Sequence, residues 1–159
     1  MKKHLIPFVF AISPFAFSGC CKSNASSTLP RQYVMSAKLT SSSQSSFEAV
    51  GPAYVTAVRL SDSLCTITGS DTMGDNIASR FTFKLRYFYG VGTYRVDSAS
   101  ESRGWFESTS PAVAQTAFAS ASVTVSAIKG STITGTFSGT LTDGATVSEG
   151  RFTAYGTGF

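Results

Sequence analysis

Apolar and polar residues alternate with a period of two along most of the chain after residue 32. Successive side chains of a β-strand point to opposite faces, so this period predicts half-buried strands. The positions that share one face of an expected strand are Tyr33, Met35, Ala37 and Leu39; Tyr54, Thr56, Val58 and Leu60; Phe81, Phe83, Leu85, Tyr87 and Tyr89; Val123, Val125 and Ala127; and Ile133, Gly135, Phe137, Gly139 and Leu141.

Short polar turns separate these runs. Asp143 and Gly144 form a preferred pair for a tight hairpin turn, and residues 151–155 form a terminal strand. Residues 111–119 begin with a proline and are few, so we expect a loop or a single helical turn there. About eight or nine strands joined mainly by hairpins predict an all-β domain, either an antiparallel β-sandwich or a small barrel.

The first 19 residues have a different pattern. A basic head, MKKH, precedes an apolar run from Leu5 to Phe17 that only Ser13 interrupts. This run is too short for a bilayer-spanning helix, which needs about 20 residues, and it is typical of a secretory signal.

The residues that follow the apolar run resemble the lipobox of bacterial lipoproteins: Phe17, Ser18 and Gly19 stand before Cys20. Phe17 departs from the usual leucine. The resemblance implies that Cys20 receives a diacylglycerol group, that the leader is cut before it, and that the new amino group is acylated. Because Lys22 rather than an acidic residue stands near Cys20, the resemblance also implies anchoring in the outer membrane. The alternative is an ordinary cleaved signal followed by two incidental cysteines.

These observations divide the chain into a signal peptide at 1–19, a lipidated cysteine and flexible tether at 20–32, and an all-β domain at 33–159. The serine-rich run 41–46 is an expected loop. Cys65 shares a strand face with Ile67, which predicts a buried free thiol, although a bridge with Cys21 is the alternative.

Composition removes most enzyme classes. His4 is the chain's one histidine and lies in the leader, so the mature domain lacks a base for Ser-His-Asp or Cys-His catalysis and a histidine ligand for metals. The formal charge of +4 includes Lys2 and Lys3 of the leader, and the remainder is too small to indicate nucleic acid binding. We therefore expect no enzymatic activity, no cofactor and no metal site.

The chain carries a series of motifs in the order Ser36–Leu39 (SAKL), 64–70 (LCTITGS), 92–94 (GTY), 135–141 (GTFSGTL) with Asp143 and Gly144, and 149–152 (EGRF). This order resembles that of an uncharacterised family of small bacterial outer-membrane lipoproteins with one all-β domain. The resemblance implies the fold and transfers no catalytic residues. Where similar proteins have a short Asn-Gly loop after the first strand, this chain has the serine-rich run that ends at Phe47.

Two groups of oxygen-bearing side chains are candidates for chemistry. The loop 71–76 carries Asp71, Asp75 and Asn76, too few for the six to eight oxygens of a calcium site, and a solvated hairpin tip explains them. Asp97, Glu101 and Glu107 are the second group. Paired carboxylates hydrolyse glycosides when they are held about 5–9.5 Å apart. Nothing in the spacing fixes that separation, and a charged loop explains this group.

Two further groups are candidates for binding. Arg80, Lys84 and Arg86 share the polar face of one strand, which suits lipid phosphates or an acidic glycan, while a solvated strand face is the alternative. Trp105 and Phe106 lie in a polar stretch and would form an exposed stacking platform for a sugar or a partner protein. A short core strand with one ring inward is the alternative.

We therefore interpret the chain as a non-catalytic binding or accessory module of the cell envelope, attached to the outer membrane through Cys20. Its membrane contact is the lipid anchor, and its further partner is an unidentified protein or glycan. Two alternatives are a small barrel that carries an apolar ligand and a purely structural envelope protein.

Overall fold

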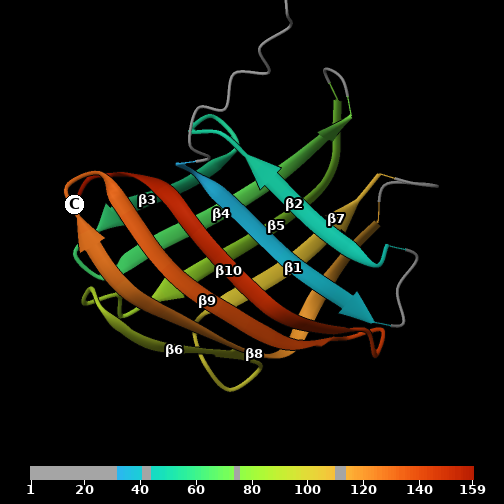
Figure 1. Ribbon diagram of the computed structural model, residues 1–159. Helices are drawn as coiled ribbons and strands as arrows, with labels where there is room; N and C mark the ends of the chain where they lie inside the picture. Colours follow the sequence, from blue (N-terminus) through green and yellow to red (C-terminus); the bar gives the residue numbers. More distant parts are fainter. Residues whose placement is uncertain (1–31, 41–43, 74–75, 110–113) are drawn as a thin grey trace, which may run out of the picture.

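The computed structural model describes residues 32–40, 44–73, 76–109 and 114–159, which form ten β-strands and no helix (Figure 1). The domain is therefore all-β, as predicted, with more strands than expected. The strands are β1 Val34–Thr40, β2 Ser46–Val50, β3 Val55–Ser61, β4 Leu64–Met73, β5 Asn76–Arg86, β6 Gly92–Asp97, β7 Arg103–Ser108, β8 Ala114–Lys129, β9 Thr132–Leu141 and β10 Thr146–Thr157.

Seven of the strands close into a barrel in the order β10-β3-β4-β5-β7-β8-β9, with β9 returning to β10. The barrel alternative is thus correct and the sandwich is not. Neighbouring strands are antiparallel except at the closure, where the end of β10 runs parallel to β3 with Tyr155 opposite Thr56. Hairpins alone do not produce this pairing, because parallel neighbours need a longer connection.

The remaining three strands extend the wall beyond the ring. The first part of β10 pairs with β1, from Thr146 opposite Thr40 to Thr153 opposite Val34, and β1 pairs with β2. In the same way β8 pairs first with β7 and further along with β6. Each long strand is therefore shared by two partners on one edge. The result is a continuous outer wall that runs from β2 through β1, β10, β9 and β8 to β6 (Figure 1).

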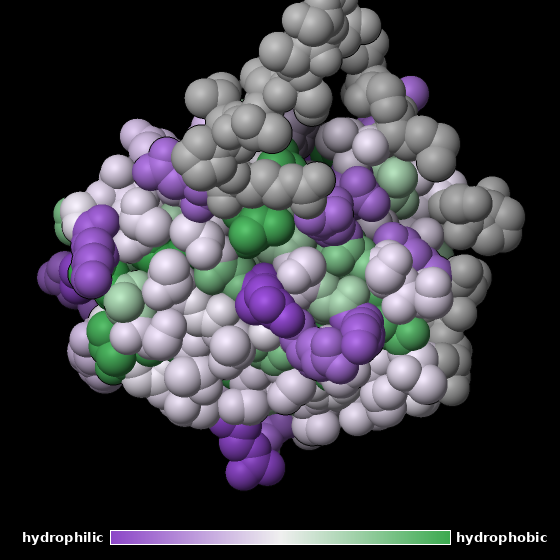
Figure 2. Space-filling model, viewed as in Figure 1, coloured by the Kyte–Doolittle hydropathy of each residue, from purple (hydrophilic) through white to green (hydrophobic). Residues whose placement is uncertain are grey.

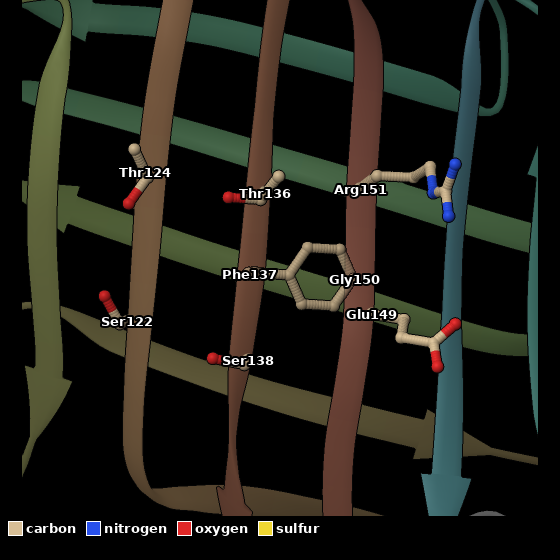
Figure 3. A pocket seen from close by; sticks show the side chains of 8 residues that line it. All are labelled: Ser122, Thr124, Thr136, Phe137, Ser138, Glu149, Gly150 and Arg151. Carbon is tan, nitrogen blue, oxygen red and sulfur yellow. The ribbon is translucent and has the colours of Figure 1, made fainter.

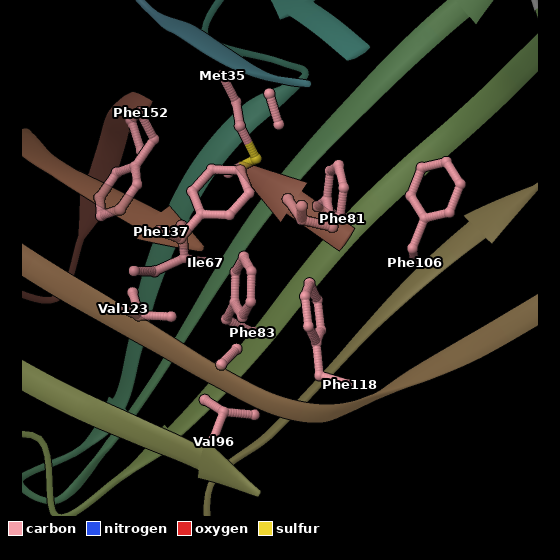
Figure 4. Packing of buried hydrophobic residues seen from close by; sticks show 14 of the residues in the cluster. Met35, Ile67, Phe81, Phe83, Val96, Phe106, Phe118, Val123, Phe137 and Phe152 are labelled. Carbon is pink, nitrogen blue, oxygen red and sulfur yellow. The ribbon is translucent and has the colours of Figure 1, made fainter. Parts of the chain in front are cut away.

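Phenylalanine rings from several strands meet inside the barrel (Figure 4). Phe81 lies at the centre, with ring centroids 4.8 Å from Phe47, 4.7 Å from Phe106 and 5.4 Å from Phe137. Aromatic rings at these separations contribute dispersion and quadrupole attraction in addition to their buried area. These side chains occupy the interior that they line, so the packing does not favour the hypothesis of an apolar ligand there.

Glycines let strands approach this crowded interior. A Cβ on Gly69 of β4 would lie 2.4 Å from Met35 Sδ, so the β1–β2 hairpin can pack on β4 only with glycine at this position. A Cβ on Gly150 of β10 would lie 2.2 Å from the Phe137 carbonyl oxygen. This second glycine follows a bulge in β10, where the register with β9 shifts.

The predicted inward faces are confirmed for the first strand, for Val123 and Val125, for the strand at 133–141 and for Phe81, Phe83 and Leu85. The prediction is wrong for Ala127, because the register of β8 shifts after Val125 and Ile128 packs against the core instead. The face that carries Tyr54 and Leu60 points outward instead, because Val55 and Ala57 fill the core from β3. The Asp143–Gly144 turn and the terminal strand are also confirmed.

The expectation for Tyr87 and Tyr89 is wrong. Tyr87 has a left-handed backbone (φ 53°), which ends the alternation of β5, so Phe88 enters the core and both tyrosines point outward. The expected loop at 111–119 is also wrong from residue 114 onward, where β8 begins. Alanine-rich spacing suggested a helical turn, but pairing with β7 and β9 determines the structure.

Cys65 is a free, fully buried thiol beside Ile67, as predicted. Burial raises its pKa to about 12. The leader, Cys20, Cys21 and most of the tether lie outside the described residues, as do 41–43 of the serine-rich run and residues 74–75 of the candidate calcium loop. Within the described ranges no helix is long and apolar enough to cross a membrane.

Candidate binding surfaces

The basic side chains predicted to share one face do so. Arg80, Lys84 and Arg86 all project from the outer face of β5, alternating with the buried Phe81, Phe83 and Leu85. Arg80 donates to Ser70 Oγ at 3.1 Å and lies 3.5 Å from Glu107 on β7. Its charge is therefore locally compensated, and the cationic character of this surface comes from Lys84 and Arg86.

The structure separates Trp105 from Phe106. Phe106 points into the barrel and is 7% exposed, so its ring is excluded from any outer surface. Trp105 is half-buried on the outer face of β7, opposite Thr82 of β5. The Lys84 ammonium lies 5.3 Å from the centroid of the indole, a cation–π contact. The alternative of a core strand with one ring inward is the correct one, and the outward ring is Trp105.

The three candidate carboxylates each have local partners. Asp97 accepts hydrogen bonds from the backbone N–H groups of Ser100 at 2.6 Å and Ala99 at 3.0 Å, and it pairs with Arg95. The Ser100 N–H contributes most to lowering the Asp97 pKa. Glu101 accepts a hydrogen bond from the Tyr87 hydroxyl at 2.9 Å, which raises the Tyr87 pKa.

The third carboxylate, Glu107, is held by Arg80 and by Gln115 Nε2, which donates to it at 3.0 Å. Structural bonds of this kind orient a carboxylate and reduce its freedom to exchange protons with a substrate. Glu101 lies in the loop between β6 and β7, as predicted for a charged loop, whereas Asp97 ends β6 and Glu107 lies within β7, so the loop prediction is wrong for these two. Among the described residues no group of three or more His, Cys, Asp or Glu side chains could hold a metal ion.

A second surface was not predicted. Three shallow hollows lie side by side on the outer wall, and their linings overlap: two share Ser122 and Ser138, and two share Glu149 and Arg151. The central hollow has a volume of about 510 Å³ (Figure 3). We call the combined depression the hydroxyl trough. Its polar side chains are Ser36, Lys38, Ser46, Glu48, Thr93, Arg95, Ser120, Ser122, Thr124, Thr136, Ser138, Glu149 and Arg151.

Strand register places these side chains in rows. One row crosses six strands from β2 to β6 with each residue opposite the next: Glu48, Ser36, Arg151, Thr136, Thr124 and Thr93. Four of these six residues carry hydroxyl groups, on strands about 4.8 Å apart, and the Thr93 and Thr124 hydroxyls hydrogen-bond each other at 2.9 Å. The wall is pale and weakly polar in Figure 2, with strongly hydrophilic side chains grouped near its middle.

The charges in the trough are unequally satisfied. Lys38 and Glu149 form an ion pair at 2.7 Å, and Arg95 pairs with Asp97. Arg151 extends from β10 toward β1 (Figure 3) and has no hydrogen bond or ion pair with the described residues. Its guanidinium is therefore available to an external acceptor at the centre of a row of hydroxyls.

The sequence carries a signal for this trough. Serine and threonine occupy the outward positions at 120–126 of β8 and along β9, while the apolar positions between them predict the core. Reading the outward positions across strands requires the register, which alternation within one strand does not supply.

Comparisons with models of protein families, with curated proteins and with solved structures find no match to this chain.

Proposed function

We propose that this chain is a non-catalytic lipoprotein of the outer membrane whose β-domain binds an acidic glycan in the hydroxyl trough. The signal-like leader and the lipobox-like residues before Cys20 support the anchor. Several acyl chains, at about 0.8 kcal/mol per buried methylene, would hold a domain of this size firmly at the bilayer.

The trough supports the glycan. Sugars present several hydroxyls on a ring, each both donor and acceptor, and serine and threonine hydroxyls match both roles. A shallow open depression that crosses six strands suits an extended chain better than a small compact ligand. The single observation that carries the proposal is the row of hydroxyls around Arg151, which has no ion pair or hydrogen bond among the described residues, because a guanidinium binds carboxylates in a bidentate geometry.

The test is binding of soluble oligogalacturonate, a linear acidic glycan, by titration calorimetry. Arg151→Ala removes a charge-assisted hydrogen bond and should weaken binding about 10- to 100-fold. Arg86→Ala, an equal change of charge on the outer face of β5, is the matched control and should leave the affinity within about twofold.

Equal losses in the two variants would show that net charge and not the trough determines binding. An unchanged affinity in Arg151→Ala would contradict the proposal.

The surface around Trp105 supports a second candidate, a protein partner. A half-buried indole next to a lysine ammonium resembles the aromatic anchors of interface hot spots. Capture of a partner that is lost in Trp105→Ala and kept in Arg151→Ala would favour this candidate over the glycan.

A further inference from the structure

Exposed apolar side chains gather at the end of the barrel where β10 finishes. We call this group the apolar rim; it comprises Leu60, Tyr87, Tyr89, Val91 and Phe159, which are 61%, 56%, 79%, 63% and 38% exposed. Single exposed apolar residues are ordinary on a protein surface, but a local group usually marks a contact.

A backbone hydrogen bond and two close contacts join the segments that carry this rim. The Phe88 backbone N–H donates to the Ser63 carbonyl at 3.1 Å, which ties the β5–β6 loop to the β3–β4 turn. The Phe88 ring lies 5.9 Å from that of Phe159, and Gly158 approaches the Arg59 carbonyl beside Leu60. Three segments distant in sequence thus meet at one end of the molecule.

The packing of Phe88 in the core makes Tyr87 and Tyr89 point to the solvent. Phe88 takes the core position at the end of β5, so its neighbours Tyr87 and Tyr89 must project outward. The Tyr94 hydroxyl donates to the Gly90 carbonyl at 2.7 Å and accepts from the Tyr89 N–H at 3.1 Å. These hydrogen bonds to the backbone hold the β5–β6 loop in place, and with it the exposed rings of Tyr87 and Tyr89.

Strand β1, which follows the segment that carries the proposed anchor, begins at the same end of the barrel. Tyr33, just before β1, packs edge-to-face on Tyr155 near the end of β10, with centroids 5.6 Å apart. The Gly156 N–H bonds to the Ser131 carbonyl in the β8–β9 turn. Cys20 stands 12 residues before Gln32, the first described residue, and such a length spans at most about 40 Å.

The side chains also suit a bilayer surface. Tyrosines favour the headgroup level, where the ring is apolar and the hydroxyl is solvated, and leucine, valine and phenylalanine favour the acyl boundary. Arg86 directly precedes Tyr87 in the chain, and Lys129 is the last residue of β8, next to the β8–β9 turn. Two exposed cations therefore flank the rim. The nearby carboxylates have partners, Asp62 with Arg59 and Glu101 with Tyr87.

We infer that the apolar rim rests in the headgroup layer of the membrane that holds the anchor, and so fixes the orientation of the barrel. The inference relies on the lipid anchor of the proposed function and adds a protein surface that contacts the lipid. With this end against the membrane, the hydroxyl trough lies on the side wall and stays open to solvent.

The test is depth-dependent quenching in the mature protein, reconstituted in vesicles of phosphatidylethanolamine and phosphatidylglycerol with brominated acyl chains. Trp105→Phe removes the native indole, and Tyr89→Trp places one in the rim. Ile77→Trp is the matched control, because Ile77 is an exposed apolar residue near the start of β5, at the opposite end of the barrel. We expect blue-shifted emission and several-fold stronger quenching for Tyr89→Trp than for Ile77→Trp.

Equal quenching at the two positions would overturn the inference. The mass of the mature N-terminus, measured on the same sample, tests the anchor separately. If Cys20 carries no lipid, the same two variants are mixed as free protein with the vesicles, and quenching confined to Tyr89→Trp still supports the rim. Absence of quenching in both variants then contradicts it.

Discussion

Tyr87 and Glu149 are the two non-glycine residues with left-handed backbone in the described part of the chain, with φ of 53° and 52°. This conformation costs an L-residue about 1 kcal/mol and needs compensation nearby. Each has it: the Tyr87 hydroxyl bonds Glu101, and the Glu149 carboxylate pairs with Lys38. Both lie in a proposed contact surface, Tyr87 in the apolar rim and Glu149 in the hydroxyl trough.

Trp105 gives a prediction at the scale of one residue. Its indole covers Thr82 and contacts Lys84 but stands outside the barrel, so Trp105→Ala should destabilise the domain by only about 1–2 kcal/mol. Denaturant melts check this value. A loss of about 3–5 kcal/mol, the range for an emptied core site, would mean that the ring packs more deeply than its half-buried position indicates.

Inward apolar residues and outward basic residues alternate along β5. Phe81, Phe83 and Leu85 face the interior, and the basic residues between them face outward. On β7, Gly104 faces Phe83, and a Cβ there would lie 2.8 Å from that ring. Strands with opposite faces so different have a strongly specified register, because a slip by one residue would bury charge.

Adjacent residues of β5 should therefore respond differently. Phe83→Ala leaves a cavity and should cost about 3–5 kcal/mol in free energy of unfolding. Lys84→Ala removes an exposed side chain and one cation–π contact, and should cost less than about 1 kcal/mol. Urea melts of the two variants, with the unchanged protein as reference, give the order. A larger loss for Lys84→Ala would contradict the assigned faces.

Strand positions and the all-β class could be predicted from the sequence because alternation and the Asp143–Gly144 turn are local signals. The pairing of β8 and of β10 with two different strands along one edge could not be predicted, since it depends on contacts between strands that are distant in sequence. The sequence also does not show that the alternation of inward and outward side chains shifts by one residue at Tyr87. This shift follows from the packing of Phe88 into the core, which depends on the tertiary structure. Likewise, Trp105 and the basic face were predictable, while the trough required register across six strands.

At the scale of the whole molecule, three features are arranged consistently. The apolar rim and the start of β1 lie at one end, and the trough crosses the outer wall from β2 to β6. A filled aromatic core keeps this wall rigid, so the rows of hydroxyls keep their spacing. A domain anchored by its N-terminal segment can then present the wall to an extended ligand beside the membrane.

The anchor itself gives a prediction at this scale. Mass spectrometry of the mature protein should find an N-terminal Cys20 that carries acyl chains, and Cys20→Ala should release the domain from membranes or leave the leader uncut. A mature chain that begins after Cys20 and carries no lipid would contradict the anchor. Variants of the barrel, such as Arg151→Ala, serve as controls and should remain acylated.

Mapping of amide chemical shifts in the isotope-labelled protein during titration with oligogalacturonate shows where on the domain the glycan binds. If the glycan occupies the hydroxyl trough, we expect shifts concentrated on β8, β9 and β10 around Thr124, Thr136 and Arg151, and none around Trp105. Shifts confined to β5 and β7, or no shifts at concentrations that saturate other glycan-binding domains, would contradict binding in the trough.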